Sequence, residues 1–286
     1  MASPSPTPPP ESPPTGVRRP GQEWAQVAEA FGRKAALYDA FGQDHPILER
    51  MRARVRRQVE SLLPAGGRLL EINAGTGADA AYFAARGCRV HATDLSGAMV
   101  ARIRARIAGG GFEGRLSAQQ LSFYDLQRAA PGPYDGVLSN MGGVNCAGEL
   151  APIARGLERL LAPGAAAVWV VMPPLCLWEL AQAARADFRL AFRRLRRGGV
   201  LARVEGLPVR THYYSPGQVL DAFGPRFRLL NLQGLSVFTP PADHKEFPAR
   251  RPRLYRLLCA LDERLAGRFP FHSLGDFFLI ALRYEP

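Results

Sequence analysis

Two glycines and an aspartate are the residues of this sequence whose spacing most clearly predicts chemistry. Gly75 and Gly77 follow the apolar run RLLEIN and precede a helical pattern. A tight turn there brings the backbone and the free N–H groups of a helix close to a ligand. Asp94 ends the next apolar run, where an acidic side chain accepts hydrogen bonds from both hydroxyls of a ribose. Together these residues predict a nucleoside-binding site.

The choice of nucleoside cofactor depends on Glu71. The spacing Gly75-x-Gly77-x-x-Ala80 also fits the fingerprint of dinucleotide-binding proteins, so an NAD-dependent oxidoreductase is one alternative. Glu71 lies four residues before Gly75, at the end of the first expected strand. A carboxylate there repels a pyrophosphate but suits the ammonium and sulfonium groups of S-adenosylmethionine. The charge therefore favours S-adenosylmethionine.

Strands and helices alternate along the segment that must position these residues. Two helices are expected between Glu23 and Leu63, and three more over 78–86, 97–108 and 149–161. The expected strands, in chain order, are RLLEIN, CRVHATD, 114–118, YDGVLSN, AAAVWVVM, FRLLNLQGLSVF and DFFLIALRYE. Such alternation predicts an α/β fold: a doubly wound, mostly parallel seven-stranded sheet with helices on both faces, of Rossmann-like type.

Four motifs of the sequence together closely resemble class I S-adenosylmethionine-dependent methyltransferases. They are Glu71-x-x-x-Gly75-x-Gly77, Asp94-x-Ser96-x-x-Met99, YDGVLSN at 134–140 and Leu160-Leu161-x-Pro163-Gly164. The likeness extends over about residues 28–172, including Phe31, Ala35 and the pair Tyr38-Asp39, and is greatest to the small-molecule branch that includes quinone-biosynthesis enzymes. It implies methyl transfer from S-adenosylmethionine to a small-molecule acceptor by in-line displacement.

The resemblance also implies a set of cofactor-binding residues: Glu71, Asn73, Ala74, Gly75, Gly77, Asp94, Leu95, Ser96, Met99, Ala118 and Asn140. Glu71 and the glycines would line the methionine half, Asp94 would hold the ribose, and Asn140 would lie beside the sulfonium. The chain departs from the family pattern twice. Asn73 replaces the usual first glycine, and Ser117-Ala118-Gln119 replaces the acidic residue often found near the adenine.

Candidate catalytic groups are fewer, because methyl transfer mainly requires alignment of donor and acceptor. His212, beside Tyr213, is the first candidate for a general base, and His45 is a weaker one. The resemblance further implies that Tyr38 closes over the cofactor from the N-terminal helices. His91, inside the second strand, is expected to be a packed core residue. The four scattered cysteines have no CxxC spacing, so no metal site is expected.

The sequence divides into a tail and one domain. Residues 1–20 are rich in proline and poor in apolar side chains, which predicts a disordered tail, and 21–286 form the methyltransferase domain with a cofactor-binding core over 64–172. Insertions at 175–213 and 240–270 follow strands and are expected to form a substrate lid. The first contains an Arg-rich helix over about 176–197 and a hairpin around Gly206.

Net charge provides the main alternative function. The chain carries a formal charge of +12, which would suit an RNA or DNA methyltransferase, but nearly all of the charge is Arg in an Ala-, Gly- and Pro-rich chain. The Asn/Asp-Pro-Pro-aromatic sequence is also missing after the fourth strand, where Ser139-Asn140 stands. A noncatalytic S-adenosylmethionine-binding protein is the other alternative. Neither a signal sequence nor a membrane span is evident, so a cytoplasmic location is expected. The acceptor and the oligomeric state are not predicted.

Overall fold

The computed structural model describes residues 20–42, 44–112 and 114–286. The predicted tail lies outside the described residues except for Pro20, where α1 (Pro20–Gly42) begins. Helix α2 (Pro46–Leu62) follows it. These are the two helices expected before the first strand. Within the described residues no helix is both long and apolar enough to cross a membrane.

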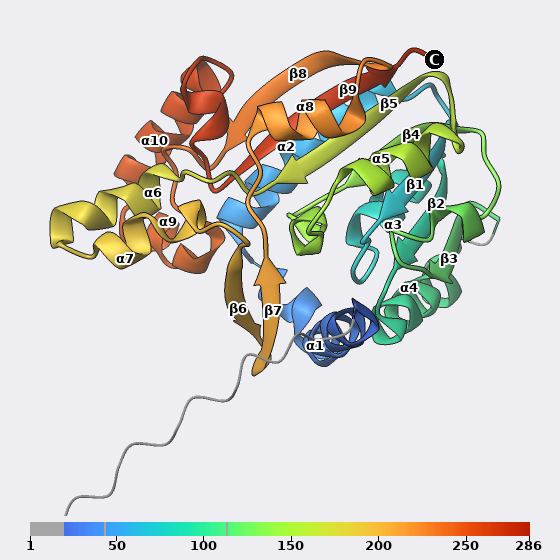
Figure 1. The fold of residues 1–286 in the computed structure, drawn as a ribbon, viewed down its shortest axis with the longest axis horizontal. Coiled ribbons are helices and arrows are strands. Elements are labelled where there is room, and N and C mark those ends of the chain that lie inside the picture. The colour runs from blue at the N-terminus through green and yellow to red at the C-terminus, as the bar shows by residue number, and fades with distance from the viewer. Residues whose placement is uncertain (1–19, 43, 113) are drawn as a thin grey trace, which may run out of the picture.

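A seven-stranded sheet forms the centre of the molecule (Figure 1) and has the predicted mostly parallel arrangement. Its order is β3-β2-β1-β4-β5-β9-β8, and only β9 runs opposite to the other six strands. The strands are β1 (Arg68–Ile72), β2 (Arg89–Asp94), β3 (Leu116–Gln120), β4 (Tyr134–Ser139), β5 (Leu161–Val171), β8 (Phe227–Leu235) and β9 (Phe277–Tyr284). β3 begins two residues later than predicted.

Helices cover both faces of this sheet, because successive residues of each strand face opposite sides. Leu70 belongs to the core cluster that includes α5 (Ala151–Glu158) and α8 (Pro216–Phe223). Leu69, on the other face, belongs to the cluster with α2, α3 (Ala78–Ala85) and α4 (Gly97–Gly110). The strand ends that carry the candidate cofactor residues are therefore fixed by two cores.

The first insertion differs from the prediction of one Arg-rich helix. It forms four short pieces: α6 (Leu177–Leu180), η3 (Ala181–Arg185), α7 (Phe188–Ala191) and η4 (Arg193–Leu195). Ala186 adopts a left-handed conformation (φ 61°), and the Asp187 side chain then caps α7 by accepting from the backbone N–H of Leu190 at 3.0 Å. A turn and a new helix start therefore interrupt the predicted helix.

The remaining insertion elements agree with the sequence expectations. Strands β6 (Val200–Val204) and β7 (Leu207–Thr211) form the predicted antiparallel hairpin, which lies apart from the main sheet. α8 begins at Pro216 and is capped by Ser215, whose side chain accepts from the backbone N–H of Gln218. The second insertion contains α9 (Phe247–Arg250) and α10 (Pro252–Leu265). Figure 1 shows the hairpin beside α1, at the end of the molecule where the candidate site lies.

Candidate functional site

The turn after β1 is held by side chains from the end of β4. Asn73 has a left-handed backbone (φ 49°), its Oδ1 accepts from the Ser139 hydroxyl at 2.8 Å, and its Nδ2 donates to the Asn140 carbonyl at 3.3 Å. A Cβ at Gly143 would overlap the Asn73 amide. Asn tolerates this backbone conformation and adds hydrogen bonds that glycine lacks, so the departure from the family pattern preserves the turn.

Asp94 connects this turn to the start of α4. Its two carboxylate oxygens accept from the backbone N–H groups of Gly75 and Ser96, each at 2.8 Å. The side chain is 9% exposed, and burial raises the pKa of Asp94 to about 6 against the opposing effect of those two hydrogen bonds. Each oxygen keeps a further lone pair for a ligand hydroxyl. Asp94 thus meets the chemical requirement for a ribose contact.

Glu71 lies behind the turn and does not line the cavity in front of it. The residue is 2% exposed, and its carboxylate lies against the backbone N–H of Ala80, in the first turn of α3. Burial and the neighbouring Asp79 hold the pKa of Glu71 well above its usual range. The N-terminus of α3, where a pyrophosphate would bind, is therefore already surrounded by the chain's own carboxyl groups.

A buried hydrogen-bond chain runs from α2 to the end of β4. Arg56 contacts Asp79, with Nε donating to Oδ1 at 2.7 Å, and the other oxygen of Asp79 accepts from Nδ2 of Asn140 at 2.8 Å. Oδ1 of Asn140 in turn accepts from the backbone N–H of Met141 at 2.8 Å. Asn140 is thereby locked in one orientation at the pocket wall, and its amide hydrogen bonds are largely used within the protein.

A cavity of about 240 Å³ lies across the carboxyl ends of the strands. Six of the eleven residues predicted to bind the cofactor line it: Asn73, Gly75, Asp94, Leu95, Met99 and Asn140. The other five, which do not line it, are Glu71, Ala74, Gly77, Ser96 and Ala118. Two of these support the wall from behind, since Ser96 donates its N–H to Asp94 and a Cβ at Gly77 would come within 2.9 Å of Ile103.

The outer wall of this cavity is formed by residues that are not among those predicted to bind the cofactor. One stripe of α1 faces it, as do residues of the hairpin and of the loops after β3 and β4. These lining residues are Trp24, Val27, Phe31, Lys34, Leu121, Phe123, Met141, Gly142, Gly143, Cys146, Met172, Val204, Val209 and Thr211. Positions 24, 27, 31 and 34 have helical spacing, so the sequence indicates that their side chains share one face of a helix. It does not indicate which part of the protein this face contacts.

A second cavity of about 260 Å³ adjoins the first, and the two share Lys34, Met141 and Met172. Both insertions contribute to its wall, through Tyr213 and Asp243 among others. Five aromatic side chains of β5, the first insertion and the loop after β8 lie elsewhere. Trp169 is fully buried and contacts Phe223 with ring centroids 4.6 Å apart, and Trp178, Phe188, Phe192 and Phe238 do not line this cavity.

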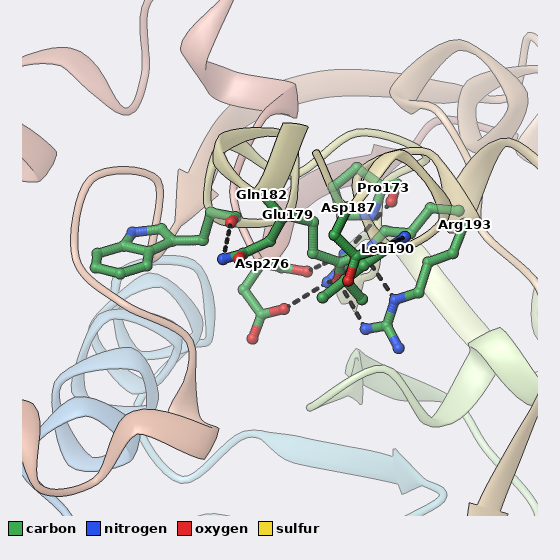
Figure 2. Close-up of polar contacts among 9 residues, drawn as sticks. Pro173, Glu179, Gln182, Asp187, Leu190, Arg193 and Asp276 are labelled. Carbon is green, nitrogen blue, oxygen red and sulfur yellow. Dashed lines mark hydrogen bonds and ion pairs between the residues drawn. The ribbon is translucent and has the colours of Figure 1, made fainter. Parts of the chain in front are cut away.

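Four charged side chains fix the insertion against the sheet beside the second cavity (Figure 2). Nε and Nη2 of Arg193 donate to the two oxygens of Glu179 at 2.7 and 2.8 Å. Nε of Arg194 donates to Glu179 at 2.7 Å, and its Nη2 donates to Oδ1 of Asp276 at 2.8 Å. Arg194 is only 4% exposed at its side chain, so its charge is compensated inside the protein.

The histidines predicted as possible bases lie outside both cavities. Val209 and Thr211 of β7 face the first cavity, so His212 points the other way, with its ring near Gly148 and Gly199. Burial and Arg210 lower the pKa of His212. His45 is fully buried and caps α2 through Nδ1, while its Nε2 contacts the Ala242 carbonyl at 2.8 Å, so its role is structural.

His91 and Tyr38 are the remaining side chains that the sequence analysis singled out. His91 is 8% exposed and is held by Ser117 and Gln119, which confirms it as a packed residue. The side chain of Tyr38 lies outside the described residues. Among the residues that the structure describes, no group of three or more His, Cys, Asp or Glu side chains is arranged to hold a metal ion.

Residues 69–164 match the family described as "Methyltransferase domain". A curated relative, malonyl-[acyl-carrier protein] O-methyltransferase of Enterobacter lignolyticus, is 32% identical over 166 residues, which cover 56% of this chain and 59% of the relative. The match therefore spans less than two thirds of that protein.

Solved structures share the fold over most of the chain. A [4+2]-cyclase, SpnF, has a TM-score of 0.63 at 15% identity, covering 92% of this chain and 97% of the cyclase. The 1,6-didemethyltoxoflavin N1-methyltransferase of Burkholderia thailandensis, solved with S-adenosylhomocysteine, has a TM-score of 0.59 at 16% identity, covering 96% and 93%. The methyltransferase CcbJ of Streptomyces caelestis has a TM-score of 0.58 at 17% identity, covering 90% and 98%.

The family match covers the strands and turns from β1 to the start of β5, which include the turn at Asn73, the Asp94 carboxylate and the end of β4 at Asn140. The likeness of fold extends beyond this segment to the seven-stranded sheet with one antiparallel strand. The chain therefore contains a segment, residues 69–164, that matches a methyltransferase domain, within a fold that it shares with the solved structures named above.

Proposed function

We propose that this protein transfers a methyl group from S-adenosylmethionine to a small-molecule acceptor. The observation that carries the proposal is the position of Asp94: a buried carboxylate at the end of β2 that faces a cavity and is oriented by two backbone N–H groups. The N-terminus of α3 argues against a dinucleotide, because the buried side chains of Glu71 and Asp79 already occupy the place where a pyrophosphate would bind, and Arg56 holds Asp79 there.

Three parts of the wall would hold the cofactor. Asp94 would accept the ribose hydroxyls, the turn at Asn73 and Gly75 would contact the amino-acid part, and Leu121 and Phe123 after β3 would enclose the base. Asn140, fixed by Asp79, would form the wall where donor and acceptor meet. Charge-assisted hydrogen bonds of the Asp94 type contribute about 1.5–3 kcal/mol each.

The bound cofactor would supply an activated methyl group, and the protein would supply alignment and exclusion of water. Apolar side chains from α1 and the hairpin, such as Val27, Phe31 and Val209, cover the cavity and keep water out. Alignment of two reactants within one pocket lowers the barrier by several kcal/mol, so a dedicated base is not required.

The acceptor would occupy the second cavity, since that cavity meets the first at Met141 and Met172. The insertions 175–213 and 240–270 would act as the lid over it. This is supported by their contribution of Arg193, Tyr213 and Asp243 to its wall. A cavity of about 260 Å³ with both apolar and polar walls suits a small organic molecule.

Calorimetric titration with S-adenosylhomocysteine tests the cofactor assignment. We expect Asp94→Ala to weaken binding by at least about tenfold, because one charge-assisted hydrogen bond is worth about 1.5–3 kcal/mol. Asp221→Ala, an exposed position on α8, is the matched control and should bind like the wild type. Tight binding of NAD without binding of S-adenosylhomocysteine would refute the proposal.

Transfer itself is tested with methyl-labelled S-adenosylmethionine and a metabolite extract, followed by identification of the labelled product. Malonyl-[acyl-carrier protein] and 1,6-didemethyltoxoflavin are included because the matched proteins carry these names. We expect label in a small molecule, and at least about tenfold less of it with Asp94→Ala at a cofactor concentration below saturation. Label found only in RNA or DNA would favour a nucleic-acid methyltransferase. Bound cofactor with no labelled product would favour a noncatalytic role.

A further inference from the structure

One face of α1 extends along the whole cofactor cavity. Trp24, Val27, Phe31 and Lys34 recur at helical spacing and all line it. A helix rises about 1.5 Å per residue, so the first and last of these positions are about 15 Å apart along its axis. This stripe is therefore long enough to contact both ends of an elongated ligand.

The two ends of the stripe lie at different strands. Trp24 contacts Phe123, which follows β3, with ring centroids 5.5 Å apart. Lys34 lines both cavities together with Met141 and Met172, which follow β4 and β5. Four strand spacings, about 19 Å, separate β3 from β5 in this sheet. Phe123 and Lys34 thus mark opposite ends of the cofactor cavity.

The two charged side chains of the cavity are separated in the same direction: the acidic one lies nearer the Phe123 end, and the basic one lies at the Lys34 end. Among the described residues that line it, Asp94 is the single acidic side chain and Lys34 the single basic one. Asp94 ends β2, nearer the Phe123 end, where the nucleoside would lie. A ligand anchored there by its ribose extends its amino-acid part, with a free carboxylate, toward Lys34.

We propose that Lys34 binds the α-carboxylate of the methyl donor and so fixes the amino-acid end of the cofactor next to the acceptor cavity. This inference rests on the proposed function. The apolar surroundings formed by Phe31, Met141 and Met172 weaken screening by water and strengthen a contact between an ammonium and a carboxylate. Lys34 acts as a binding and positioning residue.

The test compares two ligands of which only one carries the amino-acid part with this carboxylate. S-adenosylhomocysteine carries the amino acid, whereas 5′-methylthioadenosine keeps the nucleoside and the sulfur but lacks it. In calorimetric titrations we expect Lys34→Met to weaken the binding of S-adenosylhomocysteine by about tenfold or more. A tenfold change in affinity corresponds to about 1.4 kcal/mol. Binding of 5′-methylthioadenosine should stay within about twofold of the wild type, and Lys34→Arg should restore part of the loss.

Lys245→Met is the matched control, because Lys245 is the only other lysine of the chain and does not line the cofactor cavity. An equal loss for both ligands with Lys34→Met would overturn the inference, since Lys34 would then act on the nucleoside or on the fold. Unchanged affinity for both ligands would also overturn it, because Lys34 would then serve the acceptor cavity, which it also lines, and not the cofactor. A wild-type protein that binds neither ligand would overturn the proposed function as well.

Discussion

The cofactor cavity and the insertion beside the second cavity are built by opposite means. In the cofactor cavity, Asp94 is oriented by backbone N–H groups that lie within about one strand–helix unit of it, at Gly75 and Ser96. In the insertion, Arg194 connects Glu179 to Asp276, a residue 82 positions away in the chain. The first region depends on local turns, and the second depends on a buried ion network.

Because of this difference, we expect the cofactor cavity to determine ligand binding and the ion network to determine the stability of the fold. A carboxylate held by backbone groups needs no distant partner, so its position survives changes elsewhere in the molecule. A buried ion network loses much more when one member is removed, because the remaining charges stay in a medium of low polarity. Substitutions in the two regions should therefore affect different measurements.

The largest effect is expected from Arg194→Met. This substitution leaves Asp276, itself 9% exposed, without its cation, and breaking a buried ion pair in this way costs about 3–5 kcal/mol. Urea unfolding monitored by circular dichroism measures the loss of free energy of unfolding. The folded fraction should still bind S-adenosylhomocysteine within about twofold of the wild type, because Arg194 does not line the cofactor cavity.

Arg193→Met is the control for that prediction. The Arg193 side chain is 41% exposed, and its partner Glu179 keeps Arg194, so the loss should be at most about 1 kcal/mol. Equal losses for the two variants would show that the network is not cooperative. A parallel loss of S-adenosylhomocysteine affinity in Arg194→Met would show that the two regions are coupled.

A smaller effect, about tenfold at most, is expected when the pH is lowered from 7.5 to 5. The pKa of Asp94 is raised to about 6 in the ligand-free protein, so the carboxylate becomes protonated over this range and accepts ribose hydroxyls less well. Affinity for S-adenosylhomocysteine should therefore fall as the pH falls. Calorimetry across this range measures the change.

Stability should respond to Asp94 in the opposite direction. A carboxyl group whose pKa is raised on folding stabilises the folded state when protonated, and this contribution is lost as the pH rises through about 6. Asp94→Asn should remove both pH dependences, seen as the difference between wild type and variant. If the affinity of wild type and Asp94→Asn changes in parallel with pH, another group is responsible.

Most of the central sheet could be predicted because each strand–turn–helix unit is encoded locally. The apolar run of β1, the turn at Gly75 and the helix α3 follow one another within a short segment, and the same holds through β5. The Arg-rich helix could not be predicted correctly. Its interruption depends on the left-handed Ala186 and on the ion pairs of Glu179, which are features of the folded state.

The residues of the candidate site could be predicted where their position depends on local sequence. They could not be predicted where their position depends on contacts between segments far apart in the chain. Residues at strand ends, such as Asp94 and Asn140, could be placed from chain position alone. The α1 stripe ending at Lys34 could not, because its contact with the sheet joins segments far apart in sequence. The resemblance placed Glu71, next to the last residue of β1, in the cavity, but alternation of side chains along the strand turns it toward α3.

The smallest effect is expected from His212→Asn, which removes the first sequence candidate for a general base. The ring lies outside both cavities, and the backbone carbonyl of His212 is held by the Asn145 amide at 2.6 Å whatever the side chain. S-adenosylhomocysteine affinity and methyl transfer into an extract should therefore stay within about twofold of the wild type. A loss of transfer of a hundredfold with unchanged affinity would show that the hairpin rearranges and brings His212 to the acceptor, and that the insertion, unlike the cofactor cavity, changes structure during the reaction.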